Sequence, residues 1–210
     1  ESTITTPADH CMNVQATTLS GTQVGVLMFL PFEDVIHLRG KALSLSFDAW
    51  NGGSTPNLRA AVLEWTGTAD AITKDVVLTW GFGSNPSLVT NWAYINAPGA
   101  AFNVTGTPAR FSAENNVVGS SANNLAIFIW NDEDYGNSFW RLTNVQLEIG
   151  EAATDFLVPD AALELARNTR FYQVRGRGLN RDAISATAVG IGGQVIVPLR
   201  ATPTWSLIST

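Results

Sequence analysis

One short loop holds the residues of this chain with the clearest chemical potential. Three consecutive carboxylates, Asp132-Glu133-Asp134, follow an apolar segment and lead into Tyr135 and Asn137. Carboxylate and amide oxygens at this spacing can bind calcium, so Asp132 and Asp134 are a candidate Ca²⁺ site. Two carboxylates can also cleave a glycosidic bond if they flank it at a defined separation. The third interpretation is a solvated acidic hairpin loop, because runs of charge usually face solvent.

Tryptophans lie beside this loop and at other strand ends. Trp130 and Trp140 bracket the acidic loop, and Trp80 precedes the glycine-rich segment 81–85. Such rings can stack on sugar rings while neighbouring amides and carboxylates bond the hydroxyl groups. The alternative is that they fill the core of a β-sandwich; we expect this of Trp92. The predicted carbohydrate-binding residues are Trp80, Trp130, Asp132, Asp134, Tyr135, Asn137 and Trp140.

Nucleophilic and metal-dependent catalysis find no support in the residue pattern. The chain has no G-x-S-x-G segment, and neither His10 nor His37 has a recognisable catalytic setting. Cys11 follows His10 directly, and adjacent side chains of a strand point to opposite faces. One Cys and two His also disfavour a structural zinc site. We therefore predict no catalytic residue, no cofactor and no enzyme activity.

The composition of the 210 residues favours an all-β protein. Hydrophobic residues make up 45% of the chain and charged residues only 14%, with 18 Gly and seven Trp. Low charge and many aromatics argue against intrinsic disorder, and also against a helical bundle or coiled coil. Period-two alternation dominates, as in Leu43, Leu45 and Phe47, and recurs over 125–130 and 145–149. Further strands are expected at 58–65, 75–80, 101–105 and 109–113.

These strands, separated by turn clusters rich in Gly and Asn, predict an antiparallel jelly-roll sandwich over residues 1–157. The strand at 125–130 is apolar at every position, so we expect it to be covered on both faces. Residues 160–172 show helical spacing, with Asp160 at the first turn. We expect 158–175 to be a linker helix and 176–210 a small, incomplete C-terminal β segment, with strands over 184–208.

Charge is unevenly distributed along the chain. The net charge of −6 disfavours nucleic acid as a partner, because phosphate binding needs clustered Lys and Arg. Residues 165–210 nevertheless contain six Arg against one acidic residue, Asp182. Arg suits interfaces, since its planar group pairs with carboxylates and stacks on rings. No apolar run approaches the roughly 20 residues that span a bilayer, so we expect no membrane insertion.

Near the end of the predicted sandwich, residues 143–156 read TNVQLEIGEAATDF, and the segment after them ends in Arg170-Phe171-Tyr172. This stretch resembles a pattern of bacteriophage tail fibre and receptor-binding proteins. In that family a last sandwich strand reading "VQLE-G" leads to "AT-F" and a short helix ending in an Arg-aromatic-Tyr triplet. Residues 197–204 are similar to its "P-R-TPT" run, and 38–50 and 90–92 match more loosely. Thr169 stands where the family often has Cys.

The resemblance implies a carbohydrate-binding-like sandwich on a virion appendage, usually trimeric, and it carries over no binding residue. We therefore expect a structural component of a phage tail, located in the virion. It would assemble as a homotrimer with other tail proteins and bind host surface glycans. The alternatives are an accessory carbohydrate-binding domain of a secreted polysaccharide-degrading enzyme and a purely structural tail module without a ligand.

Overall fold

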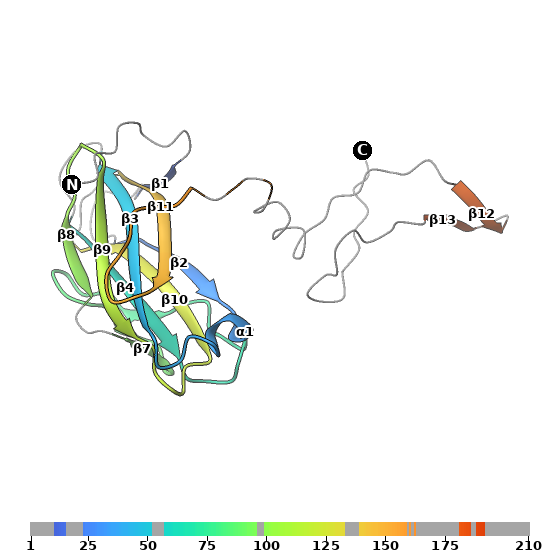
Figure 1. Ribbon diagram of the computed structural model, residues 1–210, viewed down its shortest axis with the longest axis horizontal. Coiled ribbons are helices and arrows are strands. Elements are labelled where there is room, and N and C mark those ends of the chain that lie inside the picture. The colour runs from blue at the N-terminus through green and yellow to red at the C-terminus, as the bar shows by residue number, and fades with distance from the viewer. Residues whose placement is uncertain are drawn as a thin grey trace. The chain divides into compact units, whose positions relative to one another are not determined.

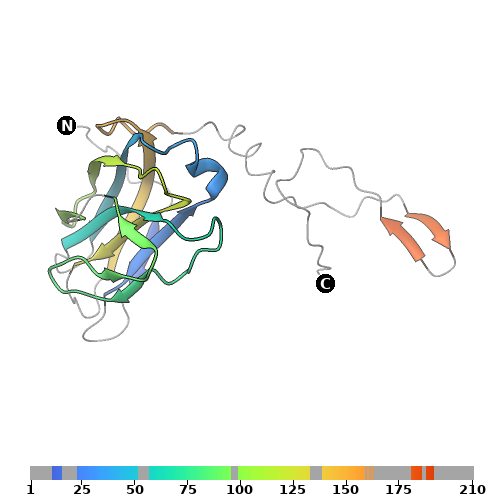
Figure 2. The ribbon, with the colours of Figure 1, turned by 90° about the horizontal axis from the view of Figure 1, so that it is seen from below.

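The structure, a computed structural model, describes residues 11–15, 23–51, 57–95, 99–132 and 139–158, with Asp160, Ala162, 181–185 and 188–191. The chain divides into two compact units, Glu1–Phe156 and Leu157–Thr210. In the second unit, β12 (Arg181–Ser185) and β13 (Ala188–Ile191) form an antiparallel pair (Figure 2). Most of the predicted helix 160–172, the rest of the linker 158–175 and the remaining part of 184–208 lie outside the described residues.

The first unit consists of two antiparallel sheets (Figure 1). The four-stranded sheet has the order β1 (Met12–Gln15), β11 (Phe139–Ile149), β3 (Ala42–Asn51) and β9 (Ala109–Val117). The five-stranded sheet has the order β2 (Gly25–Leu30), β10 (Asn124–Asn131), β4 (Asn57–Trp65) and β7 (Trp92–Tyr94), and β8 (Ala100–Asn103) also pairs with β4. A short helix, α1 (Phe32–Val35), precedes β3, and β5 (Val77–Thr79) pairs with β6 (Ser87–Leu88) in a separate hairpin.

The order of the strands is that of a jelly roll. Strands β1 to β4 alternate between the two sheets along the chain, and β9, β10 and β11 alternate again on the return. As a result β11 lies between β1 and β3, and β10 lies between β2 and β4. This pairing of early with late strands is the double-sheet jelly-roll arrangement. The predicted fold class is confirmed. No helix among the described residues has the length and apolarity needed to cross a bilayer.

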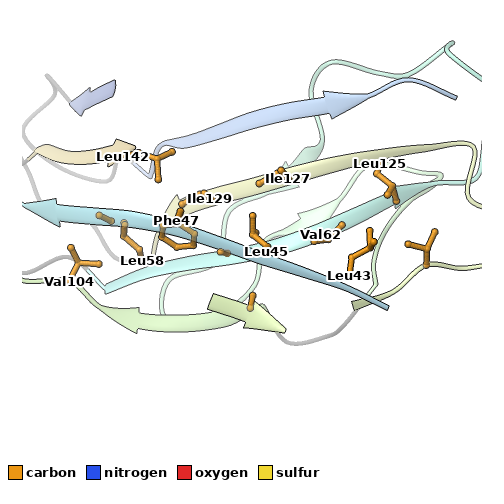
Figure 3. Packing of buried hydrophobic residues seen from close by; sticks show 14 of the residues in the cluster. Leu43, Leu45, Phe47, Leu58, Val62, Val104, Leu125, Ile127, Ile129 and Leu142 are labelled. Atoms are coloured by element: carbon orange, nitrogen blue, oxygen red, sulfur yellow. The ribbon is translucent and has the colours of Figure 1, made fainter. Parts of the chain in front are cut away.

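The main core lies between the two sheets. Leu43, Leu45 and Phe47 of β3 point toward apolar side chains of β4 and β10, as their alternation predicted (Figure 3). Their partners include Leu58 and Val62 from β4. The side chains that β3 contributes to this cluster are fully or almost fully buried along the strand. They attach the four-stranded sheet to the five-stranded sheet.

A second core covers the other face of the five-stranded sheet. Phe128 and Trp130 of β10 stack at 4.3 Å between ring centroids, and Trp65 and Trp92 lie 5.3 Å apart in the same cluster. Apolar side chains of the segment 72–92 pack over these rings. Every residue of β10 is buried, as expected for 125–130 from the uninterrupted apolar sequence of that stretch. Trp92 is 5% exposed, which confirms its structural role.

The outer face of the four-stranded sheet is covered by residues 150–156, which we call the strap. Beneath it, Ser44 of β3 donates a hydrogen bond to the carbonyl of Gly150 over 3.0 Å. The backbone N–H and the hydroxyl of Thr154 both donate to Glu148, each at 2.7 Å. These hydrogen bonds lower the pKa of Glu148, with a smaller contribution from Gln146, whereas its slight burial opposes the effect.

The far end of the strap lies over a buried ion pair. The guanidinium of Arg110 is 5.4 Å from the ring centroid of Phe156 and donates to Asp48 at 3.2 Å. Asn144 adopts a left-handed backbone (φ 50°) in a β-bulge of β11, and its amide donates to Asp48 at 2.6 Å. The segment 143–156, which carries the family resemblance, thus fastens the end of the jelly roll to its own sheet.

Candidate functional site

Two loops that are distant in sequence meet at one end of the five-stranded sheet. The N–H of Gly83 donates to the carbonyl of Asp132 over 3.1 Å. The amide of Gln23 donates to the carbonyls of Gly81, Asn131 and Asp132 at 3.0–3.2 Å. The loop after Trp80 therefore packs against the start of the acidic loop, a juxtaposition that the sequence could not show.

Arg59 of β4 joins these loops. Its Nε donates to Oδ1 of Asp132 at 2.6 Å, and its Nη2 donates to the carbonyl of Gly83 at 3.0 Å. Its Nη1 lies at the outer limit of hydrogen bonding, 3.4 Å, from both Asn85 Oδ1 and the carbonyl of Gly99. The two charged side chains are 14% and 6% exposed, so the pair is largely desolvated.

Sequence reasoning did not include Arg59 in the site, although a signal was present. It is the only charged residue before Glu64 in the otherwise largely apolar run of β4. A charged side chain in a buried strand needs a partner, since an unpaired buried charge is strongly destabilising. The pattern alone indicates that such a partner exists, but the partner is 73 residues away in the sequence.

Two exposed aromatic residues, Trp80 and Phe82, flank Gly81, whose carbonyl takes part in this junction; we call these two side chains the platform. Trp80 is 37% exposed, and its ring is 6.0 Å from that of Phe128, which supports it from the second core. Phe82 is 59% exposed, and Leu78 nearby in sequence is 69% exposed. Exposed apolar side chains concentrated in so short a segment mark a candidate contact surface. Phe82 was not among the predicted site residues.

Two of the predicted tryptophans cannot contribute a stacking surface. Trp130 is fully buried in the second core, beneath the segment 72–92, and Trp140 is 2% exposed and points into the main core. The prediction that their rings contact a ligand is therefore wrong. Trp130 and Trp140 bracket the acidic loop because each is a core residue near the end of a strand, β10 or β11.

The polar residues of the predicted site divide into two groups. Asp132 is 4% exposed and its Oδ1 is engaged by Arg59, which places it in the loop junction rather than on the surface. Asp134, Tyr135 and Asn137 lie outside the described residues. Within the described part of the chain, no group of three or more His, Cys, Asp or Glu side chains is arranged to hold a metal ion.

Tyr94 secures the other end of the segment that carries the platform. Its hydroxyl donates to the carbonyl of Pro86 over 2.8 Å, and its ring is 6.4 Å from that of Trp130. Burial raises the pKa of Tyr94 well above its usual value, although the positive charge of Arg59 partly opposes this. The hydroxyl therefore remains a hydrogen-bond donor at physiological pH. Arg59 and Tyr94 together hold the segment 81–86 against the sheet.

No protein-family model matches the chain, and no curated protein matches its sequence. Several solved structures are similar, among them the following three. One, described as "CBM4 structure and function", has 13% identity and a TM-score of 0.43, covering 68% of this chain and 72% of that one. TmCBM61, in complex with β-1,4-galactotriose, has 9% identity and a TM-score of 0.39, covering 67% and 70%. The enzymatically active domain of bacteriophage CBA120 tailspike protein 4 has 12% identity and a TM-score of 0.39, covering 67% of this chain and 15% of that one.

Proposed function

We propose that the jelly roll is a non-catalytic carbohydrate-binding module that uses Trp80 and Phe82 to stack on sugar rings. The observation that carries this proposal is the exposure of both rings on a loop held by the Arg59–Asp132 junction. A flat, exposed indole supported from below offers its face at little entropic cost, because the ring is already ordered.

Polar groups beside the platform can bond the hydroxyl groups of a sugar. Ser84 is exposed two residues after Phe82, and Asn85 is partly exposed. We place Asp134, Tyr135 and Asn137 in the same site, since they directly follow Asp132 in the chain. A site of this kind binds weakly in one copy, and linked copies gain avidity through effective concentration.

The test is a glycan array probed with the full chain and its variants. Trp80→Ala and the double variant Trp80→Ala/Phe82→Ala should lose most of the signal. Ile149→Ala is the matched control, because Ile149 has the same 59% exposure as Phe82 but lies at the end of β11 in the other sheet. Equal glycan binding by the double variant and the unaltered chain would contradict the site. Absence of binding to any glycan would favour a structural module without a ligand.

We further propose that the module belongs to a phage tail appendage in the virion and assembles there as a homotrimer with other tail proteins. The support is the resemblance at 143–172 and the six Arg of residues 165–210, which suit an interface. Light scattering of the full chain at low and high salt tests the assembly. A trimer weakened by salt is expected. A monomer at both salt concentrations would favour an accessory domain of a secreted polysaccharide-degrading enzyme.

A further inference from the structure

The distribution of charge in the first unit bears on the chemical class of the ligand. Glu1–Phe156 contains fifteen acidic and six basic side chains. All six basic residues lie in the described part of the chain: Arg39, Lys41, Arg59, Lys74, Arg110 and Arg141. An anionic glycan therefore approaches a module whose net charge repels it, and these six side chains are the only Lys and Arg that could pair with it.

The four arginines are all engaged within the module. Arg59 and Arg110 form the ion pairs with Asp132 and Asp48. Arg39 donates to the carbonyl of Ala122 and to Asn123, both at 2.7 Å. The guanidinium of Arg141 lies 4.9 Å from the ring centroid of Phe139 and 5.9 Å from that of Trp50. Arg39, Arg59 and Arg110 cannot turn to a carboxylate or sulfate of a ligand without giving up a hydrogen bond that the fold uses. Arg141 is held by its contacts with two aromatic rings.

Among the described residues, the loop junction beside the platform offers no unpaired positive charge. The one arginine at the loop junction is neutralised by Asp132, and Glu133 and Asp134 follow at once in the chain. Lys41 and Lys74 are exposed, but they lie in the loops before β3 and β5.

From these observations, and on the basis of the proposed function, we infer that the platform binds an uncharged glycan, without carboxylate, sulfate or phosphate groups. Recognition then depends on stacking against Trp80 and Phe82 and on hydrogen bonds to hydroxyl or acetamido groups. Such binding should depend little on salt, in contrast to the electrostatic capture of a polyanion.

The experiment compares two panels of oligosaccharides of equal length with the full chain. One panel contains neutral hexose and N-acetylhexosamine oligomers, and the other contains uronate and sulfated oligomers. Binding is measured by calorimetry at low and high salt, and only binding that Trp80→Ala abolishes is assigned to the platform. We expect neutral oligomers to bind about equally at both salt concentrations. The best anionic oligomer should bind about tenfold more weakly at low salt, with the gap narrowing at high salt.

Glu133→Gln supplies a second measurement. Removing this charge should strengthen binding of the anionic oligomers at low salt and leave neutral binding unchanged. Trp80-dependent binding of an anionic oligomer as tight as that of the neutral ones would overturn the inference but not the proposed function. If no member of either panel binds in a Trp80-dependent manner, the proposed function itself is contradicted.

Discussion

Arg59 and Asp132 are in contact at 2.6 Å, and this contact joins the beginning of β4 to the loop that follows β10. The same guanidinium reaches the carbonyl of Gly83, so a single side chain connects the sheet, the acidic loop and the segment that carries the platform. The position of Trp80 and Phe82 therefore depends on a largely buried ion pair rather than on the loop alone.

Replacing Asp132 by Asn should destabilise the protein by about 2–3 kcal/mol, because Arg59 keeps its charge in a largely buried position without its counter-ion. Urea unfolding measures the change. Asp155→Asn, at an exposed carboxylate of the strap, is the control and should stay within about 0.5 kcal/mol of the unaltered chain. Equal stability of the Asp132 variant would show that the carbonyl contacts of Arg59 suffice.

Adding a methyl group at Gly25 should disturb the second core. A Cβ atom there would lie 2.6 Å from Phe128 Cε2 and 3.1 Å from Trp130 Cβ. The ring of Phe128, which supports the ring of Trp80, must then shift. We expect Gly25→Ala to lower the free energy of unfolding by about 1–3 kcal/mol. Gly106→Ala is the control, since its Cβ would approach only Asn51 O, at 3.8 Å; similar losses in both variants would contradict the packing argument.

The attachment of the strap should depend on pH through Glu148. Hydrogen bonds from Thr154 lower the pKa of this carboxyl below its ordinary value of 4.5. Because the folded-state pKa is the lower one, the stabilisation is complete above the ordinary pKa and is lost as the pH falls through the folded-state value. Thermal unfolding of the unaltered chain and of Glu148→Gln should therefore differ at neutral pH and converge in acid.

Glu151→Gln, an exposed position of the strap, is the matched control for this titration. It should retain the dependence on pH that the unaltered chain shows. A constant difference in melting temperature between the unaltered chain and Glu148→Gln from neutral to acidic pH would argue against the role of Glu148.

Replacing Arg110 by Met removes the cation between Asp48 and Phe156. The Asp48 side chain is 4% exposed and would keep the hydrogen bond from the amide of Asn144. We expect a loss of about 3–4 kcal/mol, of which the second substitution Asp48→Asn should restore a fraction. Lys41→Met, at an exposed cation just before β3, should have little effect. The measurement is a double-mutant cycle by denaturant unfolding, and strict additivity would contradict the pairing.

The sequence predicted the sandwich well because alternation along a strand reports directly on burial. The inner face of β3 and both faces of β10 follow from the order of apolar side chains alone. The expected strand at 75–80 also exists over a shorter range, as β5, but it pairs with β6 outside the two main sheets. Periodicity indicates that a segment is extended, and it does not indicate which neighbour it pairs with.

The site was harder to predict, for the same reason. A strand pattern shows that Trp130 faces away from the main core, but not that the segment 72–92 covers that outer face. Asp132 was correctly placed in a loop, yet its partner Arg59 is remote in the sequence. Trp80 follows β5 directly, as expected of an aromatic at a strand end, but alternation does not show that its ring is 37% exposed although its segment covers the second core. Its contact with a ligand stays a prediction.

The strap protects the end of β11 from a force that pulls on the chain beyond it. After β11 the chain turns back over the outer face of the sheet and leaves it at Leu157, which is 75% exposed. A pull on the chain beyond this point acts first on the stack of Phe156 over Arg110, and then on the hydrogen bonds of Thr154 and Ala153. These contacts are made largely by side chains, so they can break in succession and form again. The backbone hydrogen bonds of β11, which lies between β1 and β3, experience the pulling force only after the strap has detached from the sheet.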